Sequence, residues 1–161
     1  MIDDESDFRD FFATTGPTLR RSAYLIVHDW QTAEDLTQQV MAKVYAHWSR
    51  VAPEARRAYA RRAVVNESLS HLRRHRPETP VERLPEPAGQ SDESSFDIDG
   101  VLAMLPAQQR AVLALRFVED VSVAETARLL GIAEGTVKSH TARATTTLRA
   151  HLLVAPTEDI T

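Results

Sequence analysis

The chain has 161 residues, with 43% hydrophobic and 26% charged residues, values typical of a soluble globular protein. This length accommodates one ordinary domain or two small ones. No apolar run approaches the roughly 20 residues of a membrane span, and residues 1–12 do not resemble a secretory signal. We therefore expect a cytoplasmic protein. The absence of cysteine excludes a disulfide framework, a thiolate metal site and a thiol nucleophile.

Charge is segregated along the chain. The net charge of −4 argues against a protein that coats DNA unaided, because non-specific affinity comes from Lys and Arg that neutralise phosphates. Residues 50–76 nevertheless hold eight Arg against two Glu, a net charge of +6, whereas residues 77–100 carry −6. A basic block among acidic ones requires a local explanation.

The first half of the sequence predicts about three helices. Apolar residues recur at helical spacing over residues 8–26, with a break or kink expected at Gly16-Pro17. A stripe at four-residue spacing follows over residues 36–48, behind a cap expected at Thr32. A third helix is expected from about residue 54 to residue 75.

Residues 77–98 have the composition of an extended linker. They contain four prolines, one glycine and a polar, acidic remainder, which cannot build a helix or bury a core. At about 3.4 Å per residue such a linker reaches roughly 75 Å, about two turns of duplex DNA.

Beyond the linker the pattern is again helical. Pro106 suits the first turn of a helix, and Ser122 with Glu125 forms a capping box for a short helix that Gly131 ends. A long helix starts near Glu134. Because nothing indicates a strand, the predicted fold is all-α, with two small helical domains joined by the linker.

The short helix, the glycine turn and the long helix follow the plan of a helix-turn-helix. An apolar face of the long helix, with Val137 and Leu148, turns inward. The outward face then carries Lys138, Ser139, Ala142, Arg143 and Arg149. Such side chains suit base edges and phosphates of the major groove. A helical hairpin with a merely solvated outer face is the alternative, but the combination of features favours a DNA-reading helix.

Three segments resemble a known family. LPAQQRAVLALRFVEDVSVAETARLLGIAEGTVKSHTARATTTLR, residues 105–149, is similar to region 4 of the extracytoplasmic-function (ECF) sigma factors of bacterial RNA polymerase. Response regulators and quorum regulators share part of that pattern. DWQTAEDLTQQVMAKVYAHW, residues 29–48, and YARRAVVNESLSHLRRH, residues 59–75, resemble regions 2.2 and 2.3 to 2.4 of the same family. Within that family the chain resembles the short actinobacterial SigE-type subgroup.

The resemblance implies three parts of the chain. Residues 1–76 correspond to region 2, which docks on the core polymerase and recognises the downstream promoter element. Residues 77–98 are the flexible acidic linker, and residues 99–155 correspond to region 4, which reads the upstream element. Because the chain ends at Thr161, soon after region 4, we expect no control by a long C-terminal extension.

In region 2 the resemblance implies two sets of contacts. The helix of region 2.2 docks on the clamp helices of the polymerase β′ subunit, which here assigns core binding to Glu34, Asp35, Gln38 and Gln39. Family members often have Glu at the last of these positions. In the basic block, four polar residues share one helical stripe and are assigned to DNA. They are Arg62, Asn66, Ser70 and Arg73.

The family position matched by Asn66 helps to hold an unstacked base, and residues 49–58 occupy the place of the loop that forms the pocket for that base. This loop contains proline and lacks the aromatic and glycine residues frequent in the family. For Arg56, Arg57 and Arg74 a solvated basic face is an equally good explanation.

In region 4 the resemblance assigns Lys138, Ser139 and Arg143 to the upstream element. Thr136, with Glu134, lies near phosphates, and Ala142 stands where many members carry a larger side chain. Three threonines, at positions 145–147, lie where relatives often place arginines, and they lower helix propensity. A regulator that binds DNA alone would be weakened by this loss, whereas a sigma factor is carried to DNA by its polymerase.

The expected partners are the RNA polymerase core, through its β and β′ subunits, promoter DNA and an anti-sigma factor. No cofactor, metal or enzymatic activity is predicted. His71 and His75 are four residues apart, but two arginines lie between them and no third ligand is evident. A stand-alone helix-turn-helix regulator that binds duplex DNA as a dimer is the alternative function, and a helical protein-interaction module is a weaker one.

Overall fold

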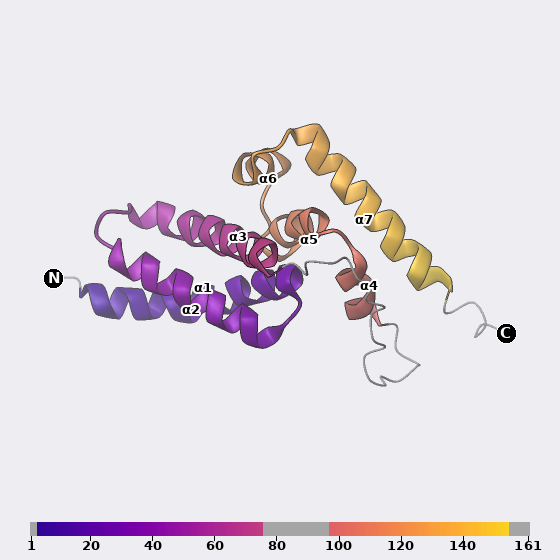
Figure 1. The fold of residues 1–161 in the computed structure, drawn as a ribbon. Coiled ribbons are helices and arrows are strands. Elements are labelled where there is room, and N and C mark those ends of the chain that lie inside the picture. The colour runs from indigo at the N-terminus through magenta and orange to yellow at the C-terminus, as the bar shows by residue number, and fades with distance from the viewer. Residues whose placement is uncertain (1–2, 76–96, 155–161) are drawn as a thin grey trace.

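The computed structural model describes residues 3–75, called here the first half, and residues 97–154, the second half. Across these two ranges every regular element is helical (Figure 1). The α-helices are α1 (Asp4–Val27), α2 (Trp30–Ala46), α3 (Arg56–Arg74), α4 (Ile98–Met104), α5 (Ala107–Leu113), α6 (Val123–Leu130) and α7 (Glu134–Val154). A 3-10 turn, η1 (Pro53–Ala55), precedes α3, and a π-helical turn, η2 (Ala114–Val118), follows α5. The all-α prediction is confirmed.

The predicted linker, residues 77–98, lies outside the described residues except for its last two positions. Asp97 caps α4, because its side chain accepts a hydrogen bond from the backbone N–H of Gly100 at 3.0 Å, and Ile98 begins that helix. The sequence pattern did not predict α4, because this helix is seven residues long and a periodic signal needs a window of about 11–18 residues.

In the first half, α1, α2 and α3 pack against one another as a three-helix bundle. Their shared core is built from large aliphatic side chains that are fully or almost fully buried, including Leu19, Ile26, Met41 and Val64. At the end of the bundle nearest the N-terminus, Trp48 packs edge-on against Phe8 and Phe11, with ring centroids 5.4 Å apart in both pairs. Aromatic and aliphatic packing together hold this half.

Two local expectations for the first half need correction. The helix is not broken at Gly16-Pro17, because Pro17 lies inside a continuous α1. The cap of α2 is Asp29 and not Thr32. Its carboxylate accepts hydrogen bonds from the Thr32 backbone N–H at 2.9 Å and from the Thr32 hydroxyl at 2.7 Å, so the helix begins at Trp30 and Thr32 lies in its first turn.

In the second half, α6, its turn and the start of α7 form the predicted helix-turn-helix. The Ser122 hydroxyl accepts a hydrogen bond from the backbone N–H of Glu125 at 3.0 Å and caps α6. Gly131 ends α6 in the left-handed conformation, with φ 68°, which glycine adopts without a steric penalty. Both expectations are confirmed, as is the start of α7 at Glu134.

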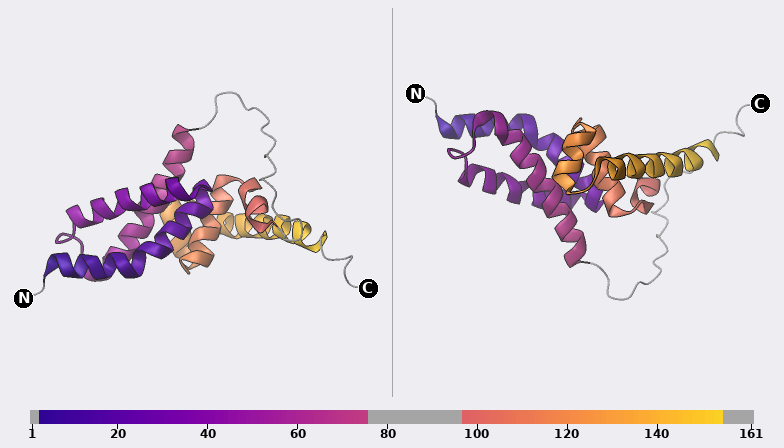
Figure 2. Two further views of the ribbon diagram at one scale, coloured as in Figure 1. Left: turned by 90° about the horizontal axis from the view of Figure 1, so that it is seen from below. Right: turned by 90° about the horizontal axis from the view of Figure 1, so that it is seen from above.

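The two halves pack directly on each other. Helix α5 and the turn η2 lie against α1, and α5 also contacts α3. Figure 2 shows, from two further directions, the second half at one end of the bundle, with α7 running away from it. Buried residues of both halves belong to one hydrophobic cluster, in which Leu19 and Ile26 meet Ala114 and Leu115.

Candidate nucleic-acid interface

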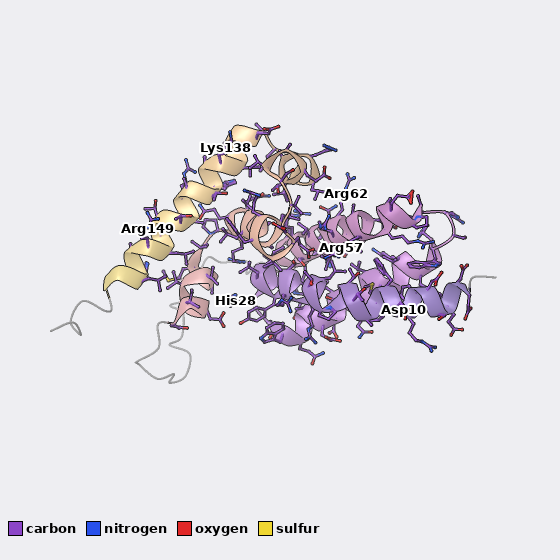
Figure 3. The ribbon with its side chains drawn as sticks, turned by 180° about the vertical axis from the view of Figure 1, so that it is seen from behind. Asp10, His28, Arg57, Arg62, Lys138 and Arg149 are labelled. Carbon is purple, nitrogen blue, oxygen red and sulfur yellow. The ribbon has the colours of Figure 1, made fainter. Side chains whose placement is uncertain are left out.

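The candidate DNA-reading surface of the second half is the outer face of α7. The inner face is fixed by Val137, which is fully buried with Val112 and Ala127, and by Ala144, which is fully buried against Leu113. Because that face is buried, the side chains predicted to contact DNA lie on the opposite, outer face. Lys138, Ala142 and Arg143 are exposed, as is Arg149, and Ser139 and Thr136 are half-buried. Figure 3 shows Lys138 and Arg149 along one helix.

The three consecutive threonines of α7 differ in their exposure. Thr146 is exposed and lines a groove beside Arg143 and Gln109. Thr145 and Thr147 are half-buried, and the Thr147 hydroxyl donates to the backbone oxygen of Arg143 at 3.1 Å. A hydroxyl bonded to its own helix offers less to a phosphate, so Thr147 contributes little to a phosphate contact.

The four residues assigned to DNA in the first half lie along one stripe of α3. Arg62, Asn66 and Arg73 are exposed and Ser70 is half-buried. The Arg73 guanidinium donates to the Ser70 hydroxyl at 3.0 Å, which joins two members of the stripe. Figure 3 shows Arg57 and Arg62 projecting from the same helix. The structure therefore brings these side chains together as one polar, basic surface.

The segment that precedes α3, residues 49–58, combines turns with η1 and is mostly exposed. Arg56 has a structural part in it. Its guanidinium donates to the Trp48 backbone oxygen at 2.8 Å and lies 3.6 Å from the centroid of the Trp48 ring. This cation–π contact ties the segment to the aromatic end of the bundle. Arg57 and Arg74 are exposed.

The polar face assigned to core binding lies on the first turns of α2. Asp35, Gln38 and Gln39 are exposed, and Glu34 is half-buried. The Glu34 carboxylate accepts hydrogen bonds from Gln38 at 2.9 Å and from Arg20 at 3.1 Å, and these bonds lower the pKa of that carboxyl. The face is therefore partly ordered within the chain itself.

Three charged or polar residues that join the halves were not predicted from the sequence, namely Ser22, Arg61 and Glu119. The Glu119 carboxylate accepts hydrogen bonds from the Ser22 hydroxyl at 2.7 Å and from the Arg61 Nε at 3.4 Å. These residues are separated by 97 and 58 positions in the sequence, so no local pattern links them.

Arg110 makes a second set of bonds between the halves. Its guanidinium donates to the Ile26 backbone oxygen at 3.0 Å from Nε and 2.6 Å from Nη2, and also to the backbone oxygens of Ala103 and Leu105. Burial lowers the pKa of Arg110. The guanidinium thus satisfies a carbonyl at the C-terminus of α1, which lacks a partner within the helix. Arg110 lies in the segment LPAQQR, which resembles region 4, so the resemblance gave a signal for this residue.

The two histidines considered for a metal, His71 and His75, stack with ring centroids 4.1 Å apart. Burial and the neighbouring positive charges lower the pKa of His71. Over the described ranges no group of three His, Cys, Asp or Glu residues is placed to hold a metal ion. The same ranges contain no helix long and apolar enough to cross a membrane.

Comparison with known families matches both halves. The family model of Sigma-70 region 2 matches residues 11–78, and that of Sigma-70, region 4 matches residues 95–148. The RNA polymerase sigma-E factor of Streptomyces coelicolor is 37% identical over 155 residues, covering 91% of this chain and 86% of the relative. The ECF RNA polymerase sigma factor SigM of Mycobacterium tuberculosis is 33% identical over 146 residues, covering 88% of this chain and 74% of the relative.

One solved structure has a similar fold over most of the chain. The sigma factor RpoE of Bartonella quintana, crystallised with the anti-sigma factor NepR, has a TM-score of 0.71 and 27% identity to this chain, and the match covers 92% of this chain and 98% of that one. A helical bundle followed by a helix-turn-helix, with both sigma-70 regions in order, defines a sigma factor of the sigma-70 class. At this identity and coverage the chain belongs to the ECF family of RNA polymerase sigma factors, which direct promoter-specific initiation of transcription.

Proposed function

We propose that the two halves divide promoter recognition between α3 and α7. The α3 stripe receives the melted strand of the downstream element, with Asn66 bonding to the edge of an unstacked base. The outer face of α7 reads the upstream element as duplex, through Lys138, Ser139 and Arg143. Thr136 and Ala142 lie on that reading surface. Residues 1–76 then act as region 2, residues 77–98 as the linker and residues 99–155 as region 4.

The observation that carries this assignment is the exposure of both polar stripes on helices whose other faces are buried. Arg62 and Asn66 project from α3 while Val64 and Val65 fill the core. On α7, Lys138 and Arg143 project while Val137 and Ala144 are buried. Basic, exposed stripes on rigid helices suit contacts with phosphates and base edges.

The exposed face of α2 is the proposed docking site for the core polymerase. Asp35, Gln38 and Gln39 are exposed and offer a carboxylate and two amides, which suits a polar contact with another helix surface. Because docking brings the chain to the promoter, weak DNA binding by the isolated protein is sufficient. This accounts for the acidic net charge and for the uncharged threonines of α7.

The polymerase forms the phosphodiester bonds of the transcript, and the chain itself catalyses nothing. Because the protein acts together with the polymerase, it acts in the cytoplasm. The structure similar to this chain that contains the anti-sigma factor NepR supports a protein inhibitor of that kind as a further partner.

Run-off transcription with purified core polymerase on promoter fragments tests the proposal. We expect transcripts only when core polymerase and this protein are both present, and weak binding of the protein alone to duplex DNA. If core polymerase with the protein initiates nowhere, while the protein alone shifts intact duplex as a dimer, the sigma-factor roles assigned here are wrong.

A further inference from the structure

Arg56 ties together the two ends of the loop between α2 and α3. Its guanidinium donates to the Trp48 backbone oxygen at 2.8 Å and lies over the Trp48 ring, 3.6 Å from the centroid. The two residues are eight positions apart, so one side chain closes residues 49–55, called here the entry loop. A charge-assisted hydrogen bond and a cation–π contact with tryptophan are strong among polar contacts. Arg56 therefore clamps the entry loop at its base.

The residue that receives this clamp is itself fixed. Trp48 is 4% exposed, and Phe8 and Phe11 of α1 pack on its ring with centroids 5.4 Å apart. Trp48 follows the end of α2 by two residues, so the guanidinium also lies near the negative end of that helix dipole. Because the ring is packed into the three-helix bundle, Arg56 fixes the entry loop on the bundle.

The other contacts of the entry loop are local. The loop is exposed apart from the half-buried Val51, and neither η1 nor α3 has a side-chain hydrogen bond at its N-terminus. Its backbone hydrogen bonds are short-range, from Arg50 and Val51 to the His47 oxygen at 3.0 and 3.2 Å, and from Ala55 to the Ala52 oxygen at 2.8 Å. Exposed, short-range hydrogen bonds open readily, so the order of the loop depends on the clamp.

The entry loop lies at the N-terminal end of the α3 stripe. Arg62, the first residue of the stripe, is six residues beyond Arg56, about 9 Å along the axis at 1.5 Å per residue. Arg50 and Arg57 are exposed at this end and extend the positive charge of the stripe. A melted strand that lies along Arg62 and Asn66 therefore continues towards the entry loop.

We propose that Arg56 is a positioning residue, which holds the entry loop as a rigid wall for the melted strand and so sets how strongly its unpaired bases are discriminated. The inference rests on the proposed reception of that strand by α3. Arg56 acts through the loop and not on DNA, because Trp48 occupies its guanidinium. A wall that is ordered before binding loses less conformational freedom on binding and accepts fewer base shapes.

Amide hydrogen exchange of the full chain, followed by mass spectrometry, tests the clamp. Arg56→Ala removes both contacts with Trp48. Arg57→Ala is the matched control, because it removes the same charge from an exposed neighbouring side chain. We expect exchange over residues 49–55 to rise about tenfold in Arg56→Ala and to stay unchanged in Arg57→Ala.

Arg56→Lys keeps the charge but loses the planar fork that both donates to an oxygen and lies on a ring, so its loop should exchange at an intermediate rate. This variant decides the question if Arg56→Ala loses helical circular dichroism. Exchange of the entry loop equal to that of the wild type in both variants would overturn the clamp.

Binding of fork-junction DNA by the holoenzyme tests the consequence for recognition. The probes come from a promoter that gives run-off transcripts, and they carry each of the four bases at the unpaired position where the wild type discriminates most. The wild type should separate the best base from the worst by about tenfold or more. Arg56→Ala should lower that ratio several-fold, and Arg56→Lys should restore part of it. Arg57→Ala removes only charge, so any loss should fall equally on all four probes.

A ratio that stays at the wild-type value in Arg56→Ala, although its entry loop exchanges faster, would overturn the role in discrimination. Equal losses on all four probes in Arg56→Ala would have the same meaning, because a merely weakened fold lowers every affinity alike. A wild-type holoenzyme that binds the four bases equally at every unpaired position contradicts the proposed function of α3. The exchange rates still decide in that case whether Arg56 clamps the loop.

Discussion

The two halves of the molecule differ in how they bury their apolar surface. The first half encloses large side chains among three long helices (Figure 1), and it adds an aromatic group in which Trp48 packs on Phe8 and Phe11. The clusters of the second half are small. One is built on Leu105, Leu113 and Ala144, and the other on Val112, Ala127 and Val137. The rest of its buried surface is covered by α1, so the second half depends on the first for part of its stability.

Leu115→Ala is the strongest test of this dependence. Leu115 lies in the second half, is fully buried and belongs to the shared cluster, so its truncation should cost about 2–5 kcal/mol. Both tryptophans, Trp30 and Trp48, lie in the first half. Urea unfolding followed by tryptophan fluorescence should therefore show a lower midpoint although the substitution is in the other half.

Ile132→Ala is the control for that experiment. Ile132 packs on a cluster made only of second-half residues, so it should lower the circular dichroism midpoint with less effect on the fluorescence. A fluorescence midpoint that does not move in Leu115→Ala would mean that the two halves unfold independently and that the second half does not stabilise the first.

The contrast between local and distant contacts also explains what the sequence could predict. The cap at Ser122, the left-handed Gly131 and the inward Val137 each follow from residues a few positions apart, and all are in the structure. The contacts of Glu119 with Ser22 and Arg61 were not predictable in this way. Glu119 reads as an ordinary charged residue in a turn, and only the packing of α1 and α3 around it removes it from water.

The site residues divide along the same line. Helical periodicity was sufficient to place Arg62 and Asn66 on one exposed stripe, and Lys138 and Arg143 on another. It could not show that Arg56 is used to bind the Trp48 ring, because that contact depends on how the segment before α3 turns back onto the bundle. The roles of the stripes in DNA binding stay predictions.

Asn66→Ala separates the two halves by function. Asn66 is exposed on α3, away from the core, so the substitution should leave stability unchanged while it removes a hydrogen bond to the unstacked base. We expect promoter opening, followed by permanganate reactivity with core polymerase, to weaken by about 1–2 kcal/mol, roughly a factor of 5–30. Duplex binding by the same holoenzyme should be nearly unchanged.

The neighbouring Glu67→Gln, which alters a pair with Lys43 instead, is the control for Asn66→Ala and should open the promoter normally. Equal losses of opening and of duplex binding in Asn66→Ala would show that the residue does not capture a base.

Thr146→Arg tests whether the second half binds duplex DNA weakly only because it lacks positive charge. Thr146 is exposed beside Arg143, so an arginine there should reach a phosphate. We expect the isolated protein to bind duplex DNA more tightly, with a plot of log affinity against log salt steeper by about 0.9. Thr146→Gln, of similar length but uncharged, should leave that slope unchanged. A Thr146→Arg slope equal to that of the wild type would place this part of α7 away from the DNA.

The smallest expected effect is a dependence of stability on pH at the junction of the halves. His28 ends α1 with a left-handed backbone, φ 58°, stacks on Tyr24 with centroids 4.8 Å apart and lies 4.0 Å from Asp99 of α4. Burial lowers its pKa from 6.5, and Arg110 adds to this, while Asp99 opposes it. The folded protein therefore favours the neutral ring, and the unfolded chain binds the proton more readily.

Stability from this group is thus fully present above pH 6.5 and is lost as the pH falls towards the lowered pKa. His28→Asn keeps a residue that tolerates the left-handed backbone but removes the titration. Unfolding midpoints measured from pH 8 down to about pH 5 should fall less steeply in this variant than in the wild type. His71, whose pKa is also lowered, leaves a residual slope, because it titrates within the first half alone. Since His28 reports on the contact with α4 and His71 does not, an identical pH profile in His28→Asn and wild type would show that protonation at the junction does not bear on how the second half is held.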